Sequence, residues 1–365
     1  MVRPSVSILL MTLIHAQAAS GYHMVCYFDS WAKDRTGVNK MVANEIPAKL
    51  CTHVIYAFVD IITDDGLLKI SEPVDEETYR DMMELRKSNP KLKVMLGVDG
   101  GRDGDLKFSK MASSHKKKQD FMHYIIKYLR KYDFDGIDLD WEYPASEDKH
   151  LFAQLLRDLR EAFDIDADIW RMKRLLLTSA VSAYTETINS AYDVPSLRES
   201  LDFINLMTYD LQGKGTSHNA PLKNSYYCVE SAVNHWHRLG MPKEQIVVGL
   251  PAYGRTWSIV ASDVIPPPGT PAEALGTLKY RDICSNPAYI ANSKVDTKAG
   301  VPYTWANDIW VSYDDPTSYR TKCQYIKSNK LGGGMMWSLA SDDHNGMSCG
   351  HGKFPLLSTI SDCLL

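Results

Sequence analysis

The stretch Asp135-Gly-Ile-Asp-Leu-Asp-Trp-Glu-Tyr-Pro144 alternates carboxylates with apolar residues, and it indicates which fold the chain adopts. On an extended strand successive side chains point to opposite faces, so Asp138, Asp140 and Glu142 would share one face. Neighbours in this row would lie roughly 6.6 Å apart, from a rise of about 3.3 Å per residue. At that spacing one carboxylate raises the pKa of the next. The pattern therefore predicts a strand over 136–142 that carries catalytic acids.

Two other structures could produce this pattern. A solvated edge strand also alternates acidic and apolar residues. Here, however, amphipathic helical patterns lie on both sides of the stretch, which is typical of a parallel strand buried on both faces. A calcium-binding loop is excluded, because glycine is missing from its sixth position and glutamate from its twelfth.

Short apolar runs, rich in β-branched or aromatic residues, alternate with amphipathic helical stretches along the whole chain. The runs lie at 24–28, 52–59, 93–99, 136–142, 175–182, 203–209, 246–252 and 333–339. Alternation of strands and helices predicts an α/β fold with a parallel sheet, and eight units predict closure into a (β/α)8 TIM barrel. From Gly254 to about Pro316 no helical period is visible, and this stretch is too long for an ordinary loop.

Charge and hydropathy limit the classes of partner. The 365 residues include 41 basic and 45 acidic side chains, which give a net charge of −4. This balance offers no electrostatic surface for nucleic acid or an anionic membrane, so we expect an uncharged partner. No run of about 18 apolar residues follows the N-terminal segment, and no membrane span is expected.

The N-terminal segment has the three parts of a secretory signal peptide. Arg3 precedes an apolar stretch over Ile8–Ile14, and the small residues around Ala18 follow it. We therefore expect residues 1–20 to be a signal peptide that is cleaved near Ala18 to Ser20. The mature protein is expected to be secreted and extracellular.

Seven cysteines in an exported chain permit disulfides and leave at least one thiol unpaired. Their spacing alone does not determine the pairing. Cys323 and Cys363 fall in register with apolar residues on helical faces, so we expect both to be buried thiols. No cysteine has the neighbours of a nucleophile or a metal ligand, and neither a metal nor a cofactor is expected.

Residues 135–142 resemble the D-x-x-D-x-D-x-E signature of family 18 glycoside hydrolases, which are the chitinases and their non-catalytic chitinase-like relatives. Three later stretches look like further motifs of this family, in the family's order: Met207-Thr-Tyr-Asp210, Leu250-Pro-Ala-Tyr-Gly-Arg255 and Gly332-Gly-Gly-Met-Met-Trp-Ser-Leu339. Four motifs in order make the resemblance extend over nearly the whole chain. The likeness is strongest to the secreted animal-type chitinases.

The resemblance implies an architecture and two disulfides. A small α+β insertion domain is expected at 256–315, between strands seven and eight, with the catalytic barrel formed by 21–255 and 316–365. The resemblance pairs Cys26 with Cys51 and Cys284 with Cys349. Cys228 is then left over, together with the two cysteines expected on helices.

The resemblance also implies catalytic roles. Glu142 is the general acid, and its pKa must be raised by burial and by Asp140 for it to hold a proton near neutral pH. The substrate's own 2-acetamido oxygen attacks C1, so the reaction retains configuration. Asp140 orients the acetamido group and can share a proton with Asp138, while Tyr209 hydrogen-bonds the same carbonyl.

A wider set of groove residues follows from the same likeness. Trp337 would be the platform under the reacting sugar, although a barrel-core tryptophan is the alternative interpretation. Asp210 and Met207 would line the floor and Tyr143 a wall. The remaining expected substrate-binding positions are Tyr27, Phe58, Trp31, Tyr253, Arg255, Gly100 and Gly101.

Two stretches depart from the family pattern. Where the family has Ser-x-Gly-Gly-Trp, this chain has Gly97-Val-Asp-Gly-Gly-Arg102, so Gly101 replaces a groove tryptophan. Asp99 adds a carboxylate that either shifts the pH optimum or pairs with Arg102. After Asp210, a short loop replaces one that carries a tryptophan, so the aglycone side is expected to have lost an aromatic residue.

Together these features predict a secreted, monomeric endochitinase that hydrolyses β-1,4 bonds of chitin or chitooligosaccharides. The alternative is a chitinase-like lectin that binds chitooligosaccharides without cleaving them. Non-catalytic relatives commonly lack the glutamate or an aspartate of the row, whereas this chain has all four acids. A hydrolase acting on the chitobiose core of glycans is a third, weaker interpretation.

Overall fold

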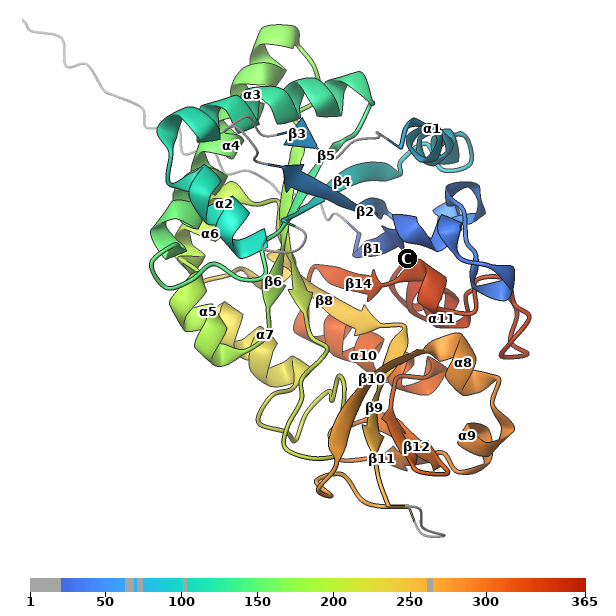
Figure 1. Ribbon diagram of the computed structural model, residues 1–365. Coiled ribbons are helices and arrows are strands. Elements are labelled where there is room, and N and C mark those ends of the chain that lie inside the picture. The colour runs from blue at the N-terminus through green and yellow to red at the C-terminus, as the bar shows by residue number, and fades with distance from the viewer. Residues whose placement is uncertain (1–20, 63–68, 71–74, 101–103, 261–264) are drawn as a thin grey trace, which may run out of the picture.

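The computed structural model describes residues 21–62, 69–70, 75–100, 104–260 and 265–365 (Figure 1). The expected signal peptide, Gly101 and Arg102 lie outside the described residues.

Eight parallel strands close into a barrel (Figure 1). They are β1 (His23–Asp29), β2 (His53–Ile62), β4 (Lys93–Asp99), β5 (Gly136–Asp140), β6 (Leu176–Ser182), β7 (Phe203–Met207), β8 (Ile246–Pro251) and β14 (Gly333–Trp337). Strand β1 pairs with both β14 and β2, which closes the ring, and the short β3 (Lys69–Ile70) adds an antiparallel edge to β2. The predicted (β/α)8 barrel is confirmed, although β5 ends two residues before its predicted end.

Helices surround the barrel. The α-helices of this layer are α1 (Glu76–Glu84), α2 (Gly104–Ala112), α3 (His115–Lys131), α4 (Lys149–Trp170), α5 (Thr185–Ala191), α6 (Val194–Ser200), α7 (Val229–Arg238), α10 (Pro316–Asn329) and α11 (Pro355–Leu364). Short 3₁₀ helices are η1 (Ser30–Asp34), η2 (Gly37–Asn39), η3 (Ala43–Glu45), η4 (Ala48–Leu50), η5 (Leu85–Lys87), η6 (Lys243–Gln245) and η7 (Leu339–Ser341). In α4, Phe152, Leu156, Leu159 and Phe163 recur at helical spacing and are buried, because this face packs onto the sheet.

An antiparallel sheet interrupts the barrel between β8 and β14, its seventh and eighth strands. Its members are β9 (Tyr253–Ser258), β10 (Glu273–Lys279), β11 (Lys294–Asp296), β12 (Val301–Ala306) and β13 (Ile309–Ser312), with α8 (Tyr280–Cys284) and α9 (Pro287–Ala291). Trp257 and Trp310 pack edge to face in its core, with ring centroids 5.3 Å apart. The predicted α+β insertion at this place is confirmed.

Side chains of the barrel strands separate into two cores, because alternate residues face inward and outward. Ile137 and Leu139 of β5 belong to the outer core between strands and helices. The barrel interior is filled by Val25, Tyr27, Ile55, Ala57, Met95, Ala180, Phe203, Met207, Val247 and Met335. Asp138 and Asp140 alternate with the outward residues, so the pleat of β5 directs both carboxylates inward.

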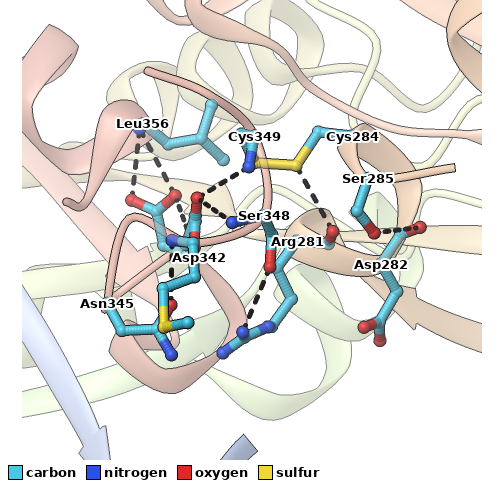
Figure 2. Close-up of a disulfide and its surroundings, with 11 residues drawn as sticks. Arg281, Asp282, Cys284, Ser285, Asp342, Asn345, Ser348, Cys349 and Leu356 are labelled. Carbon is cyan, nitrogen blue, oxygen red and sulfur yellow. Dashed lines mark hydrogen bonds between the residues drawn. A yellow bond between two sulfur atoms is a disulfide. The ribbon is translucent and has the colours of Figure 1, made fainter. Parts of the chain in front are cut away.

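The chain forms three disulfides among its described residues. Cys26–Cys51 and Cys284–Cys349 are the two expected bonds, and the second ties α8 to the loop after β14 (Figure 2). Cys323–Cys363 is a third, so the expectation of buried thiols there was wrong. Helices α10 and α11 pack together and bring the two Cα atoms within 6.4 Å, which is disulfide range. Cys228 is a free, buried thiol.

Candidate active site

A cavity of about 210 Å³ opens at the carboxyl ends of the barrel strands. It is lined by Tyr27, Phe58, Asp99, Asp140, Glu142, Tyr143, Ala180, Ala183, Tyr184, Met207, Tyr209, Asp210, Tyr253 and Trp337. A larger hollow of about 930 Å³ lies between α8, α10 and α11, but none of the predicted acidic row lines it. The small cavity is therefore the candidate site, at the end of the barrel where active sites of this fold form.

The structure brings most of the predicted site residues to this cavity, and four lie elsewhere. Asp138 is fully buried beneath it, Arg255 reaches it through Asp210, and Trp31 contacts Trp337 near its edge. Gly100 does not line the cavity. A Cβ atom there would lie 2.0 Å from the Cα of Gly104, so glycine is required where the loop meets the start of α2.

Asp138 anchors the acidic row by accepting three hydrogen bonds. Tyr27 Oη and Thr178 Oγ1 donate to its carboxylate over 2.6 and 2.5 Å, and Asn205 Nδ2 donates over 3.0 Å. Burial nevertheless raises the pKa of Asp138 to about 6, because the charged form loses its hydration. No hydrogen bond joins Asp138 to Asp140 among the described residues, and both oxygens of Asp138 accept from other donors.

Stability should depend on pH through Asp138. Its pKa is about 6 in the folded protein against an ordinary 3.8, so the folded state binds the proton more tightly. Its contribution to the free energy of unfolding is fully present below pH 3.8 and is lost as the pH rises through about 6. We expect the melting temperature to fall over this interval less steeply in Asp138→Asn than in the wild type. Equal slopes in thermal melts of the two proteins would contradict this.

Asp140 and Glu142 both face the cavity and both have raised pKa values. Asp140 is 6% exposed, and burial together with the charges of Glu142, Asp138 and Asp99 raises its pKa well above the usual range. Its Oδ1 has no hydrogen-bond partner among the described residues. Glu142 is exposed by its accessible surface, yet partial desolvation of its carboxyl group, with the charges of Asp99 and Asp210, raises its pKa against an opposing hydrogen bond from Tyr143. Glu142 lies beyond the end of β5 and reaches the cavity from the following turn.

Asp210 connects the cavity wall to the insertion. Tyr253 Oη and Arg255 Nε each donate to its Oδ1 over 2.6 Å, and Arg255 Nη2 lies 2.5 Å from Oδ2. Its backbone has a φ of 59°, the left-handed region that few non-glycine residues adopt. Asn219 Oδ1 accepts from its N–H over 2.9 Å, and Tyr184 Oη donates to its carbonyl over 2.5 Å. These contacts hold the strained residue in place.

A chain of polar groups supports Asn219 from the insertion. Its backbone N–H donates to Ser312 Oγ over 3.1 Å, and that hydroxyl contacts His218 Nδ1 over 3.2 Å. His218 Nε2 lies 3.0 Å from Asp296 Oδ2. The loop after Asp210 is therefore fixed by residues that are distant in sequence, and no sequence pattern had indicated them.

Aromatic rings surround Trp337. Its ring stacks on Phe58 at a centroid distance of 5.7 Å and an interplanar angle of 16°, and it meets Tyr27 edge to face at 5.5 Å. Trp31, which is 44% exposed, lies 6.3 Å away. Trp337 is only partly buried and lines the cavity. Trp337 therefore packs against the barrel interior and also presents part of its ring to the cavity.

Two residues that the sequence did not single out also matter here. Tyr184 lines the cavity wall, and Asn205 supports Asp138 from β7. Tyr184 lies two residues beyond the end of β6, and residues at that position in a barrel commonly reach the active site. This position could have identified Tyr184 from the sequence, whereas no sequence pattern pointed to Asn205.

Within the described ranges there is no group of three or more side chains that could hold a metal ion. None of the helices in the part of the chain that the structure describes is both long and apolar enough to cross a membrane.

A family model described as "Glycosyl hydrolases family 18" matches residues 23–342 of the chain. The chain is 35% identical to human chitinase-3-like protein 2 over 380 residues, which cover 97% of this chain and 96% of that protein. It is also 35% identical to mouse chitotriosidase-1 over 376 residues, which cover 96% of this chain and 80% of that protein. These matches confirm the resemblance found in the sequence.

Solved structures of related proteins show the same likeness to family 18. The "immunomodulatory active chitinase" TsES1 from Trichuris suis matches with a TM-score of 0.86 and 34% identity, covering 94% of this chain and 100% of that chain. Human YKL-39, described as "a pseudo-chitinase with retained chitooligosaccharide binding properties", matches with a TM-score of 0.86 and 35% identity, covering 94% of this chain and 99% of that chain. Similar proteins thus include both an active chitinase and a pseudo-chitinase.

Proposed function

The chain belongs to glycoside hydrolase family 18, and on this premise we propose that it is a secreted chitinase that cleaves β-1,4 bonds between N-acetylglucosamine units. The observation that carries the proposal is the acidic row in one cavity: Asp140 and Glu142 face it with raised pKa values, above the anchored Asp138. A carboxyl group that keeps its proton at higher pH suits general acid catalysis.

The proposed reaction uses these side chains as follows. Glu142 donates its proton to the glycosidic oxygen as the bond to C1 breaks, and the acetamido carbonyl oxygen of the same sugar bonds to C1. Asp140 offers an unpaired carboxylate oxygen that can accept the acetamido N–H. Water then attacks C1, the bond from C1 to the acetamido oxygen breaks, and the water gives a proton to Glu142, so configuration is retained.

Tyr209 is the residue that we propose holds the acetamido carbonyl. Within the described residues its hydroxyl has one hydrogen-bond partner, the sulfur of Met335 at 3.9 Å, and sulfur is a weak acceptor. The hydroxyl is therefore available to donate to a substrate oxygen. A sugar without an N-acetyl group would lack both the nucleophile and this contact.

A chitinase-like lectin is the second candidate. It is supported by the likeness to human YKL-39, the pseudo-chitinase that retains chitooligosaccharide binding. The presence of Asp140 and Glu142 in one cavity, with Asp138 hydrogen-bonded nearby, supports hydrolysis. Three disulfides support secretion, because such bonds persist in oxidising compartments.

Product analysis separates the two candidates. The purified protein is incubated with N-acetylchitohexaose, and the products and their anomers are followed from the earliest times. A retaining chitinase should release shorter oligomers with β-anomeric reducing ends. Saturable binding of the hexamer without any cleavage would instead show the lectin.

The charge of Asp99 should influence the pH dependence of turnover. Asp99 lines the cavity and contributes to the raised pKa of Glu142. In Asp99→Asn this contribution is lost, so Glu142 loses its proton at lower pH and the alkaline limb of the activity profile moves to lower pH. Asp308→Asn, an exposed change in the turn between β12 and β13, is the control. If the alkaline limb of the activity profile stayed in place in Asp99→Asn, the charge of Asp99 would be neutralised by a nearby group in the wild type.

A further inference from the structure

Three tyrosines form a row that leads from the cavity wall to the surface. Tyr184 lines the cavity, and its ring meets that of Tyr227 with centroids 4.6 Å apart. The ring of Tyr227 meets that of Tyr226 at 4.8 Å. Tyr227 is half-buried, whereas Tyr226 is 75% exposed. Two ring-to-ring contacts therefore connect the candidate site to the exposed ring of Tyr226.

One carboxylate fixes the outer two rings. Tyr227 Oη donates to Glu186 Oε2 over 3.0 Å, and Tyr226 Oη donates to Glu186 Oε1 over 3.4 Å. Tyr227 also contacts Tyr226 edge to face, with an interplanar angle of 76°. The rings are thus ordered before any ligand arrives, which reduces the entropy lost on binding.

The strand order places this row across the barrel mouth from Trp31. Strand β6 is four strands away from β1 in either direction around the ring. Trp31 follows β1 directly and Tyr184 follows β6, so these side chains lie at opposite ends of a path over the acids. A linear chain that enters beside Trp31 and crosses the cavity would leave past Tyr184.

The row also lies beside the shortened loop. Tyr184 Oη accepts from the backbone N–H of Gln212 over 3.2 Å, just after Asp210. The sequence predicted that this side of the groove had lost an aromatic residue. The aromatic residues here come instead from two other segments: Tyr184 lies directly before α5, and Tyr226 and Tyr227 lie before α7. Helices α5 and α7 pack together.

We propose that Tyr226, supported by Tyr227, is an additional platform for the chain of N-acetylglucosamine units where it leaves the cavity. The inference rests on the proposed function, because it takes the ligand of the cavity to be a chitooligosaccharide. An exposed phenol ring suits the apolar C–H face of a pyranose, and continuity with the cavity identifies the sugar chain as its occupant. An oligomer too short to extend past Tyr184 does not reach this platform.

Binding of short and long oligomers tests the platform. In a Glu142→Gln background, which prevents cleavage, N-acetylchitotriose and N-acetylchitohexaose are titrated by calorimetry. We expect Tyr226→Ala to weaken hexaose binding by on the order of tenfold, by analogy with the loss of a stacking ring in other ligand sites. Triose binding should be unchanged, and Tyr226→Phe should retain hexaose affinity because it keeps the ring.

Trp170→Ala is the matched control. Trp170 is 69% exposed at the end of α4 that leads into the start of β6, away from the mouth of the barrel. Its replacement should leave the affinity for both oligomers unchanged.

Four results would overturn the inference. Unchanged hexaose affinity in Tyr226→Ala would exclude the platform while leaving the proposed function intact, and so would an equal loss for triose and hexaose. A self-association in solution that Tyr226→Ala abolishes, with hexaose affinity unchanged, would assign this face to a second copy of the chain. Failure of the wild-type protein to bind either oligomer would overturn the proposed function itself, and the platform with it.

Discussion

Glu142→Gln should lower the turnover of N-acetylchitohexaose by about 100-fold to 10,000-fold, the usual contribution of a general acid. The amide keeps the size and shape of the side chain but has no proton acidic enough for the glycosidic oxygen. Binding of the oligomer should persist, since Trp337, Tyr209 and Asp140 still line the cavity. The measurement is the steady-state rate of product release, together with oligomer affinity by calorimetry.

Glu147→Gln is the matched control for this change. Glu147 is exposed in the turn before α4, and its side chain accepts a hydrogen bond from the neighbouring Ser146. Its replacement should leave both turnover and binding at wild-type values. If Glu142→Gln retained turnover within a few-fold of the wild type, Glu142 would not be the acid. If it lost binding as well, the change would have damaged the cavity.

Lys322→Met should reduce the free energy of unfolding by about 3–5 kcal/mol, the usual cost of leaving one member of a buried ion pair alone. Lys322 Nζ lies 2.6 and 2.7 Å from the two carboxylate oxygens of Asp314, and both side chains are 0% exposed. Without the ammonium group, Asp314 must stay charged in an apolar site or bind a proton. Denaturant unfolding measures the loss, which should lessen at acidic pH as Asp314 becomes protonated.

Two further variants identify the cause of that loss. Lys322→Met combined with Asp314→Leu removes both charges and should recover most of the stability. Ser318, which donates to Asp314, also donates to the carbonyl of Asp315 and keeps a partner. Lys116→Met breaks an exposed pair with Asp120 and should cost about 1 kcal/mol or less. A double variant no more stable than Lys322→Met alone would show that the cost comes from lost packing.

Much of the fold was predictable because its signals are local. Each barrel strand is buried on both faces and therefore appears as a short apolar run, and each helix shows one apolar face. The acids of β5 stood out because carboxylates are rare inside such a run. The end of β5 was misplaced, since Glu142 belongs to the following turn while still reaching the cavity.

The third disulfide shows where local signals mislead. A cysteine on an apolar helical face looks the same whether it is a thiol or half of a disulfide. Only the packing of α10 against α11 brings Cys323 and Cys363 together. The same limit applies to the contact of Asn219 with Asp210, because a buried amide has no sequence pattern that identifies its partner.

The sequence by itself indicated the barrel and the row of acids, because strand and helix periods and the spacing of carboxylates are properties of neighbouring residues, while the insertion domain was implied by the resemblance to family 18. The tertiary structure alone decided the environment of those acids: the three donors to Asp138, the unpaired oxygen of Asp140 and the tyrosine row beyond Tyr184. Desolvation and hydrogen bonding depend on which distant segments pack together, and the raised pKa values of the acids result from that packing.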